Sequence, residues 1–139
     1  TSRAHQMALS VIYFSPLQFL FWYDVPSDYS GEGEVEFFNH LPTRWDETRV
    51  LNATVGDTVT IARRSGDAWF IGSISDTTAR SLEVPLAFLP AGASYTAHVY
   101  SDGGATTVMG AQHAVTRDDI LTIELPASGG NAIWLEPSH

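Results

Sequence analysis

From Glu47 onward, apolar residues recur at every second position in short runs, and turn-forming residues follow each run. Leu121, Ile123 and Leu125, for example, alternate with polar residues. Because successive side chains of a strand point to opposite faces, this period of two predicts strands that are buried on one face. Turn signals separate the runs at residues 55–57, 65–67, 90–92, 101–104 and 128–130. The pattern predicts a mainly β fold, an antiparallel β-sandwich of about seven or eight strands.

The first 44 residues follow a different pattern. An amphipathic helix is predicted by apolar residues at spacings of three and four: Ala4, Met7, Ala8, Val11 and Ile12. It should end before Pro16, since the residue before a proline avoids the α region. Residues 15–23, SPLQFLFWY, are mostly apolar and do not alternate, which is typical of a strand buried on both faces. A second, short helix is predicted by apolar residues that share one face: Val35, Phe38 and Leu41.

The charge balance makes some partners unfavourable. The chain has 16 acidic and 7 basic residues and a net charge of −9. Nucleic acid and anionic membrane surfaces attract clustered positive charge, so neither is an expected partner. The apolar run at residues 11–23 is interrupted by polar residues and is too short to cross a bilayer as a helix. The absence of cysteine excludes disulfides and thiolate metal sites.

Three segments carry a family resemblance. They are AHQMALSVIYFSPLQ at residues 4–18, FFNHLPTRWDETRVLNATVGDTVTIARRSGDAWFIGSISD at 37–76, and LEVPLAFLPAGASYTAHVYSDG at 82–103. In their order and spacing they closely resemble the C-terminal region of glycoside hydrolase family 97, the α-glucosidase and α-galactosidase family. The sequence departs from the family after Gln18, where FLFWYDVPSDY is bulkier than the continuation that the family leads us to expect.

The resemblance implies a larger enzyme with an N-terminal β-sandwich, a central (β/α)8 barrel and a C-terminal β-sandwich. The barrel would hold the catalytic carboxylates and a calcium ion, and no cofactor is expected in this chain. Residues 1–44 would be the last helix, strand and helix of the barrel, and residues 45–139 the C-terminal sandwich. The chain begins at Thr1 without an initiator Met, so we expect it to be part of a longer protein. By resemblance, that protein would be a periplasmic or secreted bacterial enzyme.

On this basis we expect a non-catalytic accessory domain that packs on and stabilises the catalytic barrel and mediates oligomerisation. The parent enzyme would hydrolyse α-glucosidic or α-galactosidic bonds, and the sequence leaves open which of the two. One alternative is a carbohydrate-binding module that uses exposed aromatic residues. A second is a small independent enzyme, against which the missing acid/base pair argues.

No catalytic residue is expected in this chain, because the family motifs that supply the two carboxylates lie outside it. Asp24 follows the predicted barrel strand, on the face of a barrel where active sites are built. Trp45 could stack on a sugar beside Asp46 and Glu47. Adjacent residues of a strand point to opposite faces, however, so we expect these two carboxylates not to meet at one substrate. Three residues are therefore candidates for substrate contact in the whole enzyme: Asp24, Trp45 and Glu47.

Other polar and aromatic residues are expected to be structural. Core positions are predicted for four aromatic residues that could bind sugar only by projecting from one sheet face: Trp69, Tyr95, Tyr100 and Trp134. Turn roles are predicted for three aspartates whose spacing is not that of a calcium loop: Asp102, Asp118 and Asp119. The five histidines show no paired metal-ligand spacing. No metal site is therefore predicted.

Self-association is expected through residues 1–30. If this segment is cut from a barrel, five large apolar residues have lost the neighbours that would bury them: Phe14, Leu17, Phe19, Phe21 and Trp22. An exposed apolar patch of that size is rare on a soluble monomer, and a symmetric dimer is the commonest way to cover it. The alternative is that the segment folds back and covers itself on the sandwich.

Overall fold

The computed structural model describes residues 1–15 and 32–138. These residues form two helices and eight strands: α1 (Arg3–Ile12), α2 (Glu32–His40), β1 (Glu47–Thr54), β2 (Thr58–Ser65), β3 (Ala68–Ser75), β4 (Arg80–Pro85), β5 (Ser94–Gly104), β6 (Thr107–Thr116), β7 (Ile120–Leu125) and β8 (Gly130–Pro137). The predicted mainly β fold is confirmed, with eight strands where seven or eight were expected. The predicted barrel strand at residues 15–23 lies, apart from Ser15, outside the described residues.

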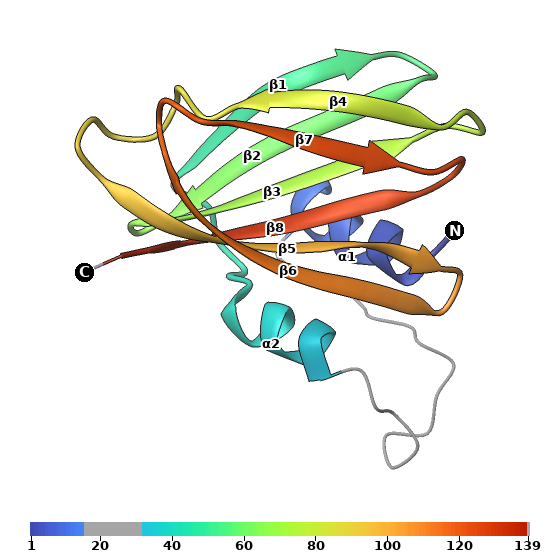
Figure 1. Cartoon of the computed structure of the whole chain (residues 1–139), viewed down its shortest axis with the longest axis horizontal. Coiled ribbons are helices and arrows are strands. Elements are labelled where there is room, and N and C mark those ends of the chain that lie inside the picture. The colour runs from blue at the N-terminus through green and yellow to red at the C-terminus, as the bar shows by residue number, and fades with distance from the viewer. Residues whose placement is uncertain (16–31, 139) are drawn as a thin grey trace.

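The strands form two sheets that lie one over the other (Figure 1). The larger sheet has six strands in the order β1-β2-β3-β8-β5-β6, and the smaller sheet consists of β4 and β7. Alternate side chains of β3 and β8 point toward the smaller sheet, as expected for a sandwich. The core between the sheets draws on both of them: Trp69, Ile71, Val84, Leu125, Ile133 and Leu135.

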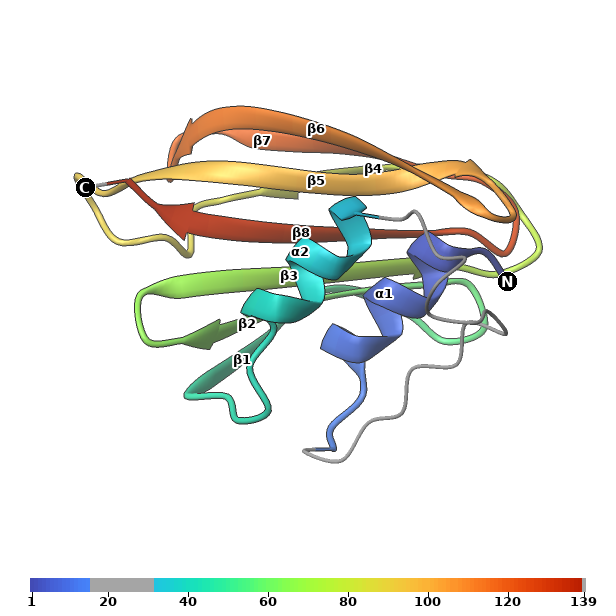
Figure 2. The same ribbon diagram turned by 90° about the horizontal axis from the view of Figure 1, so that it is seen from below.

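The helices cover the opposite face of the six-stranded sheet, where Figure 2 shows them in front of β3 and β8. The Ser2 side chain caps α1 by accepting a hydrogen bond from the backbone N–H of His5, at 3.1 Å. The apolar face predicted for this helix is confirmed, because four of its residues are fully buried: Ala4, Met7, Ala8 and Val11.

Two glycines allow α1 to lie against the backbone of the sheet. A Cβ atom at Gly72 in β3 would lie 2.6 Å from the carbonyl oxygen of Ala8, and one at Gly130 in β8 would overlap the backbone of His5. Neither position therefore has room for a side chain while α1 stays in place. The two glycines thus form a surface on the larger sheet against which α1 packs closely, and we call this surface the seat of α1.

The second predicted helix is present, but the face predicted for it was partly wrong. Val35, expected to be buried, is 44% exposed, whereas Phe37 is fully buried. Phe37 packs edge-on against Phe70 of β3 and Tyr100 of β5, with ring centroids 6.0 and 5.3 Å apart. Phe38 and Leu41 are partly buried beside this cluster. The larger aromatic ring thus takes the contact with the sheet, and the helix is rotated away from the predicted orientation.

One turn lies two residues beyond its predicted position. The glycine-rich stretch at residues 101–104 was expected to be a turn, but it belongs to β5, and the chain reverses at residues 105–106. The pairing of β5 with β6 slips between Asp102 and Gly104, which marks a bulge. Gly104 has a φ of 138°, a conformation that suits glycine. The glycines therefore accommodate an irregular strand end rather than the turn itself.

Candidate functional site

Of the three residues predicted to approach substrate, Asp24 lies outside the described residues. Trp45 precedes β1 and is half-buried. Its ring packs edge-on against Phe70, with centroids 5.5 Å apart, and the guanidinium carbon of Arg63 lies 5.7 Å from its centroid. Trp45 thus belongs to the aromatic cluster between the helices and the sheet, and the guanidinium of Arg63 lies at one edge of that cluster.

Arg63 of β2 is the cation that joins this cluster to the end of α1. Its side chain donates from Nη1 to the carbonyl oxygen of Tyr13, at 2.9 Å, and from Nη2 to that of Ile12, at 3.0 Å. The last carbonyls of a helix lack intrahelical partners and carry partial negative charge, so a guanidinium is well suited to bind them. Arg63 is 2% exposed, and burial lowers the pKa of its guanidinium. An arginine is nevertheless still charged at neutral pH.

The neighbouring arginine, Arg64, binds the two carboxylates that the sequence singled out. Its Nε donates to Oε2 of Glu47 at 3.3 Å, and its Nη1 lies 3.8 Å from Oδ2 of Asp46. The two carboxylates thus contact the same side chain although they are adjacent in sequence, because Asp46 precedes the first strand residue and is free of the strand alternation. That they do not meet at one substrate stays a prediction. Asp46 Oδ2 also accepts a hydrogen bond from the backbone N–H of Gly66, at 2.8 Å.

These contacts favour the charged form of the Glu47 carboxylate, as in an ion pair that stabilises structure. A hydrogen bond from Arg49 Nε, at 2.6 Å, together with Arg64, lowers the pKa of the Glu47 carboxyl below its ordinary value. A general acid in glycoside hydrolysis needs the opposite, a pKa raised by an apolar environment. The arrangement around Asp46 and Glu47 thus ties β1 to β2 and does not resemble an acid/base pair.

The four aromatic residues considered as a sugar platform are buried, as predicted. Trp69 and Tyr95 belong to the core between the sheets, with exposures of 2% and 3%. Tyr100 and Trp134 lie on the other face, beneath the helices, with exposures of 4% and 6%. Residues on opposite faces of one sheet cannot form a single platform.

The Trp134 ring stacks with the rings of two histidines, a contact that no sequence pattern indicates. The ring of His40, at the end of α2, stacks on the indole with centroids 3.9 Å apart, and the ring of His98 in β5 stacks at 4.4 Å. His98 and Trp134 are direct partners in the β5–β8 pairing. Glu136 Oε2 lies 2.9 Å from His98 Nε2, and Gln112 Nε2 lies 3.2 Å from His98 Nδ1. This histidine–tryptophan stack fastens α2 to the sheet.

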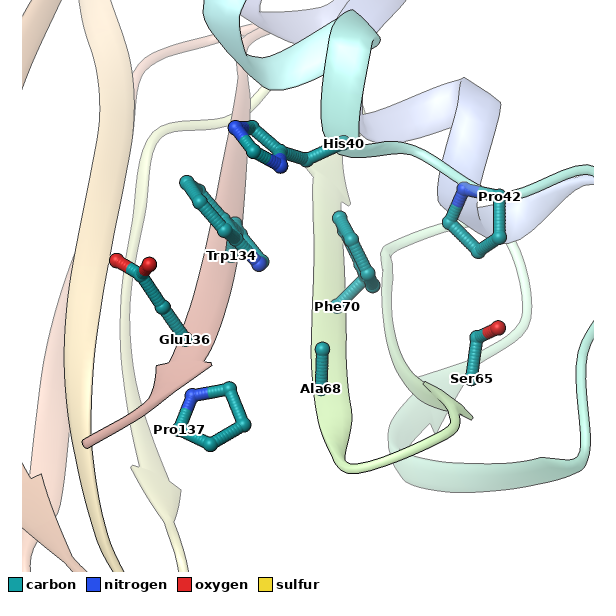
Figure 3. A pocket seen from close by; sticks show the side chains of 8 residues that line it. All are labelled: His40, Pro42, Ser65, Ala68, Phe70, Trp134, Glu136 and Pro137. Carbon is teal, nitrogen blue, oxygen red and sulfur yellow. The ribbon is translucent and has the colours of Figure 1, made fainter. Parts of the chain in front are cut away.

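A shallow pocket of about 290 Å³ opens beside this stack (Figure 3). Phe70 and Ala68 form its apolar floor, and His40 covers the Trp134 ring in the close-up view. Glu136 is the one carboxylate among the eight lining residues. Hydrolysis of a glycoside requires two carboxyl groups across the scissile bond, and sugar stacking requires a free ring face, so the pocket fits neither role.

Of the three aspartates considered as calcium ligands, Asp118 and Asp119 lie at the turn between β6 and β7, as predicted. Asp102 instead lies within β5 and contacts the start of β8, so the turn role predicted for it was wrong. Asp119 Oδ2 accepts from the backbone N–H of Thr116, at 2.6 Å, and Asp102 Oδ2 accepts from that of Gly130, at 2.8 Å. Within residues 1–15 and 32–138, no three His, Asp or Glu side chains are close enough to hold a metal ion. The calcium that the resemblance implies for the full-length enzyme therefore does not fit this part of the chain. Neither α1 nor α2 is long and apolar enough to span a membrane.

The chain is thus a β-sandwich with two helices on one face of its larger sheet, and arginines bind its candidate carboxylates. The chain belongs to the family described as glycosyl-hydrolase 97 C-terminal, oligomerisation, whose model matches residues 44–136. The resemblance found in the sequence is confirmed. This family is that of the C-terminal domain, and the catalytic domain of its enzymes is a separate part of the protein.

Individual relatives agree with the family. A retaining α-galactosidase of Bacteroides thetaiotaomicron is 36% identical, over 97% of this chain and 21% of that protein. The "Probable retaining alpha-galactosidase" of Streptomyces bingchenggensis is 33% identical, over 94% of this chain and 20% of that protein. The structure of a glycoside hydrolase family 97 enzyme in complex with acarbose, from Pseudoalteromonas sp. strain K8, matches with a TM-score of 0.91 and 32% identity, over 100% of this chain and 23% of that chain. The chain thus spans about a fifth of the length of these relatives.

Proposed function

We propose that this chain is the domain of a family 97 glycoside hydrolase that packs against the end of the catalytic barrel and stabilises it. We propose also that it mediates association between copies of the enzyme. The observation that carries the proposal is the seat for α1 on the large sheet. Gly72 and Gly130 leave room for the helix backbone, and Arg63 binds the carbonyls at its end. By resemblance α1 is a helix of the barrel, so the same contacts would hold barrel and sandwich together.

The packing of α1 on the sheet is tested in the whole protein by the variant Gly72→Val, with Gly110→Val as the matched control. A side chain at Gly72 meets the Ala8 carbonyl, whereas one at Gly110 meets nothing within 4 Å. The expected result is a lower melting temperature of the barrel for Gly72→Val alone, with kcat/KM unchanged well below the transition. Equal melting temperatures of the barrel in the two variants would contradict the proposal that the packing of α1 on the sheet stabilises the barrel.

Association between copies is supported by the description of the family as an oligomerisation domain. The finer proposal from the sequence is that residues 1–30 make the contact. The apolar face of α1 is buried on its own sheet, so the exposed apolar residues of the described part of this segment are Tyr13 and Phe14, at 57% and 89%. Sedimentation of Phe14→Ser tests this surface, and unchanged dimerisation would contradict it.

For the parent enzyme we propose α-galactoside hydrolysis, with retention. Its support is the naming of two relatives as retaining α-galactosidases, while a matching family 97 structure was solved with acarbose. Assays of the whole protein on nitrophenyl α-galactoside and α-glucoside decide between the two substrates. A periplasmic or secreted location and a calcium ion in the barrel belong to the same proposal, and calcium content of the whole protein tests the latter.

The rival function is carbohydrate binding by this chain, and it would need exposed aromatic rings that can stack on a sugar. The Trp134 ring is 6% exposed and stacks with two histidine rings. In residues 1–15 and 32–138 the exposed tyrosine, tryptophan and phenylalanine side chains are Tyr13 and Phe14 alone. Affinity electrophoresis on starch, pullulan and galactomannan tests the rival. The expected result is unretarded migration, and retardation on any of the three would favour a binding module.

A further inference from the structure

We propose that two copies of this chain join through β6, edge to edge and antiparallel, so that their six-stranded sheets form one continuous sheet. In the described chain β6 pairs with β5 alone and forms one edge of the larger sheet. This inference rests on the proposed function in oligomerisation and names a surface other than residues 1–30. A strand at a sheet edge presents unpaired N–H and C=O groups, which are a template for another strand.

The composition of β6 sets it apart from the other edges. Its sequence, TVMGAQHAVT, contains no proline and no Asp, Glu, Lys or Arg, although it is ten residues long. Charged side chains, proline, bulges and short length are the usual means by which proteins prevent strands from adding to an edge. None of these protects the length of β6, since the slip in its pairing lies near the β5–β6 turn, between Asp102 and Gly104.

The opposite edge of the same sheet, β1, has the protections that β6 lacks. It carries Glu47 and Arg49, and its pairing with β2 slips between Val50 and Asn52. The two strands of the smaller sheet are six residues long and contain charged residues or proline. Within the described structure, β6 is thus the long edge that is left open.

The exposure of β6 agrees with a partner on this side. Eight of its ten residues are exposed, Met109 to 54%, and a Cβ atom at Gly110 would meet nothing within 4 Å. Both faces of the strand as well as its edge are therefore accessible over most of its length. Gln112 is held by His98 of β5, which anchors the middle of β6 to its own sheet.

A second copy of the chain is the occupant that the charges favour. With a net charge of −9, two copies repel each other wherever acidic surfaces meet, and an uncharged strand is where they can approach. Two-fold symmetry about an axis perpendicular to the sheet makes the two β6 strands antiparallel and keeps both helix layers on one side. Such a contact is self-complementary and closes after two copies, which is typical of soluble homodimers.

The test uses sedimentation equilibrium of the chain with a lysine pair on each edge. Ala111→Lys with Ala114→Lys places charge on β6, and Val50→Lys with Ala53→Lys places the same charge at the same spacing on β1, at four exposed positions. Both pairs make the net charge less negative by the same amount, so a general change in repulsion affects them equally. We expect the β6 pair to weaken dimerisation at least tenfold and the β1 pair to leave it within twofold.

Hydrogen exchange provides a second measurement that needs no variant. With rising concentration of the unmodified chain, the outward amides of β6 should exchange at least tenfold more slowly, and those of β1 should not change. Dimerisation that survives the β6 lysines with unprotected β6 amides would overturn the inference while leaving the oligomerisation proposal intact. Loss of dimer in Phe14→Ser but not in the β6 pair would assign the contact to residues 1–30. A chain that remains monomeric at every concentration would defeat both proposals.

Discussion

Gly72 and Ala8 are in backbone contact across the layers of the molecule. They come from β3 and α1, and a Cβ atom added at Gly72 would lie 2.6 Å from the Ala8 carbonyl oxygen and 3.0 Å from the Cβ atom of Val11. The φ angle of Gly72 is not among the positive ones. The glycine is therefore required for space and not for its backbone conformation.

Gly72→Ala should destabilise the chain by about 1–3 kcal/mol, the usual cost of a clash in a packed core. The overlap is with backbone, which cannot rotate away, so α1 must shift from the sheet. Gly110→Ala is the control, since its methyl group enters open space. Chemical denaturation measures both variants, and equal stabilities for the two would contradict the seat described for α1.

Arg63→Lys should cost about 2–3 kcal/mol, because a lysine cannot bind both carbonyls and a charged hydrogen bond is worth about 1.5–3 kcal/mol. Arg64→Lys is the matched control in the adjacent residue. Arg64 is about one-third exposed in its side chain, and surface ion pairs contribute at most about 1 kcal/mol. Urea unfolding of both variants is the measurement, and an Arg63 variant no less stable than the Arg64 variant would show that the capping of α1 contributes little.

Trp69→Ala should cost about 3–5 kcal/mol, as expected for a large aromatic residue removed from a core. Trp69 is 2% exposed and packs against Phe88, with ring centroids 4.7 Å apart. Its indole N–H has no hydrogen-bond partner among the described residues. Trp69→Phe therefore loses volume but leaves no donor unpaired, and it should cost clearly less. Thermal melts compare the two variants. If Trp69→Ala lowers the free energy of unfolding by less than about 1 kcal/mol, the ring is not a core residue and is again a candidate for sugar contact.

The stability of the chain should fall between pH 10 and pH 12 through Tyr100. Burial of the phenol, with the negative charge of Glu36 nearby, raises the pKa of Tyr100 to about 12. In the unfolded chain a tyrosine titrates near pH 10, so over this interval the unfolded state releases a proton that the folded state keeps. The stabilisation is complete below pH 10 and is lost as the pH rises toward 12, by about 2–3 kcal/mol.

Tyr100→Phe should remove most of this alkaline loss, because the variant lacks the buried phenol that titrates. Urea unfolding at pH 9, 10.5 and 11.5 gives the comparison. Burial also raises the pKa of Tyr95, so a residual loss should persist in Tyr100→Phe. A Tyr100→Phe variant with the same pH dependence as the unmodified chain would contradict the assignment.

The sequence predicted the elements better than the contacts between them. The strands and α1 follow from periods of two and of three to four, which burial on one face imposes on each segment separately. Phe37 and Val35 show where this reasoning ends. Both positions are apolar, and which of them faces the sheet depends on the room beside Phe70 and Tyr100, which no local pattern contains.

The contacts that join distant segments were beyond prediction for the same reason. Gly72 signals a close approach within a strand, but nothing in the sequence says that α1 is what approaches it. The stack of His40, Trp134 and His98 depends on the pairing of β5 with β8, which are brought together only by the sheet order. The shared contact of Asp46 and Glu47 with Arg64 likewise depends on where the strand alternation begins, which is one residue later than the sequence analysis assumed.

The central claim, that copies of the protein associate through this chain, is tested most directly by its mass in solution. Sedimentation equilibrium of the unmodified chain, from low to high micromolar concentration, measures it. The account predicts a reversible dimer with twice the 15.2 kDa mass of one chain. A single species of 15.2 kDa throughout that range would contradict it.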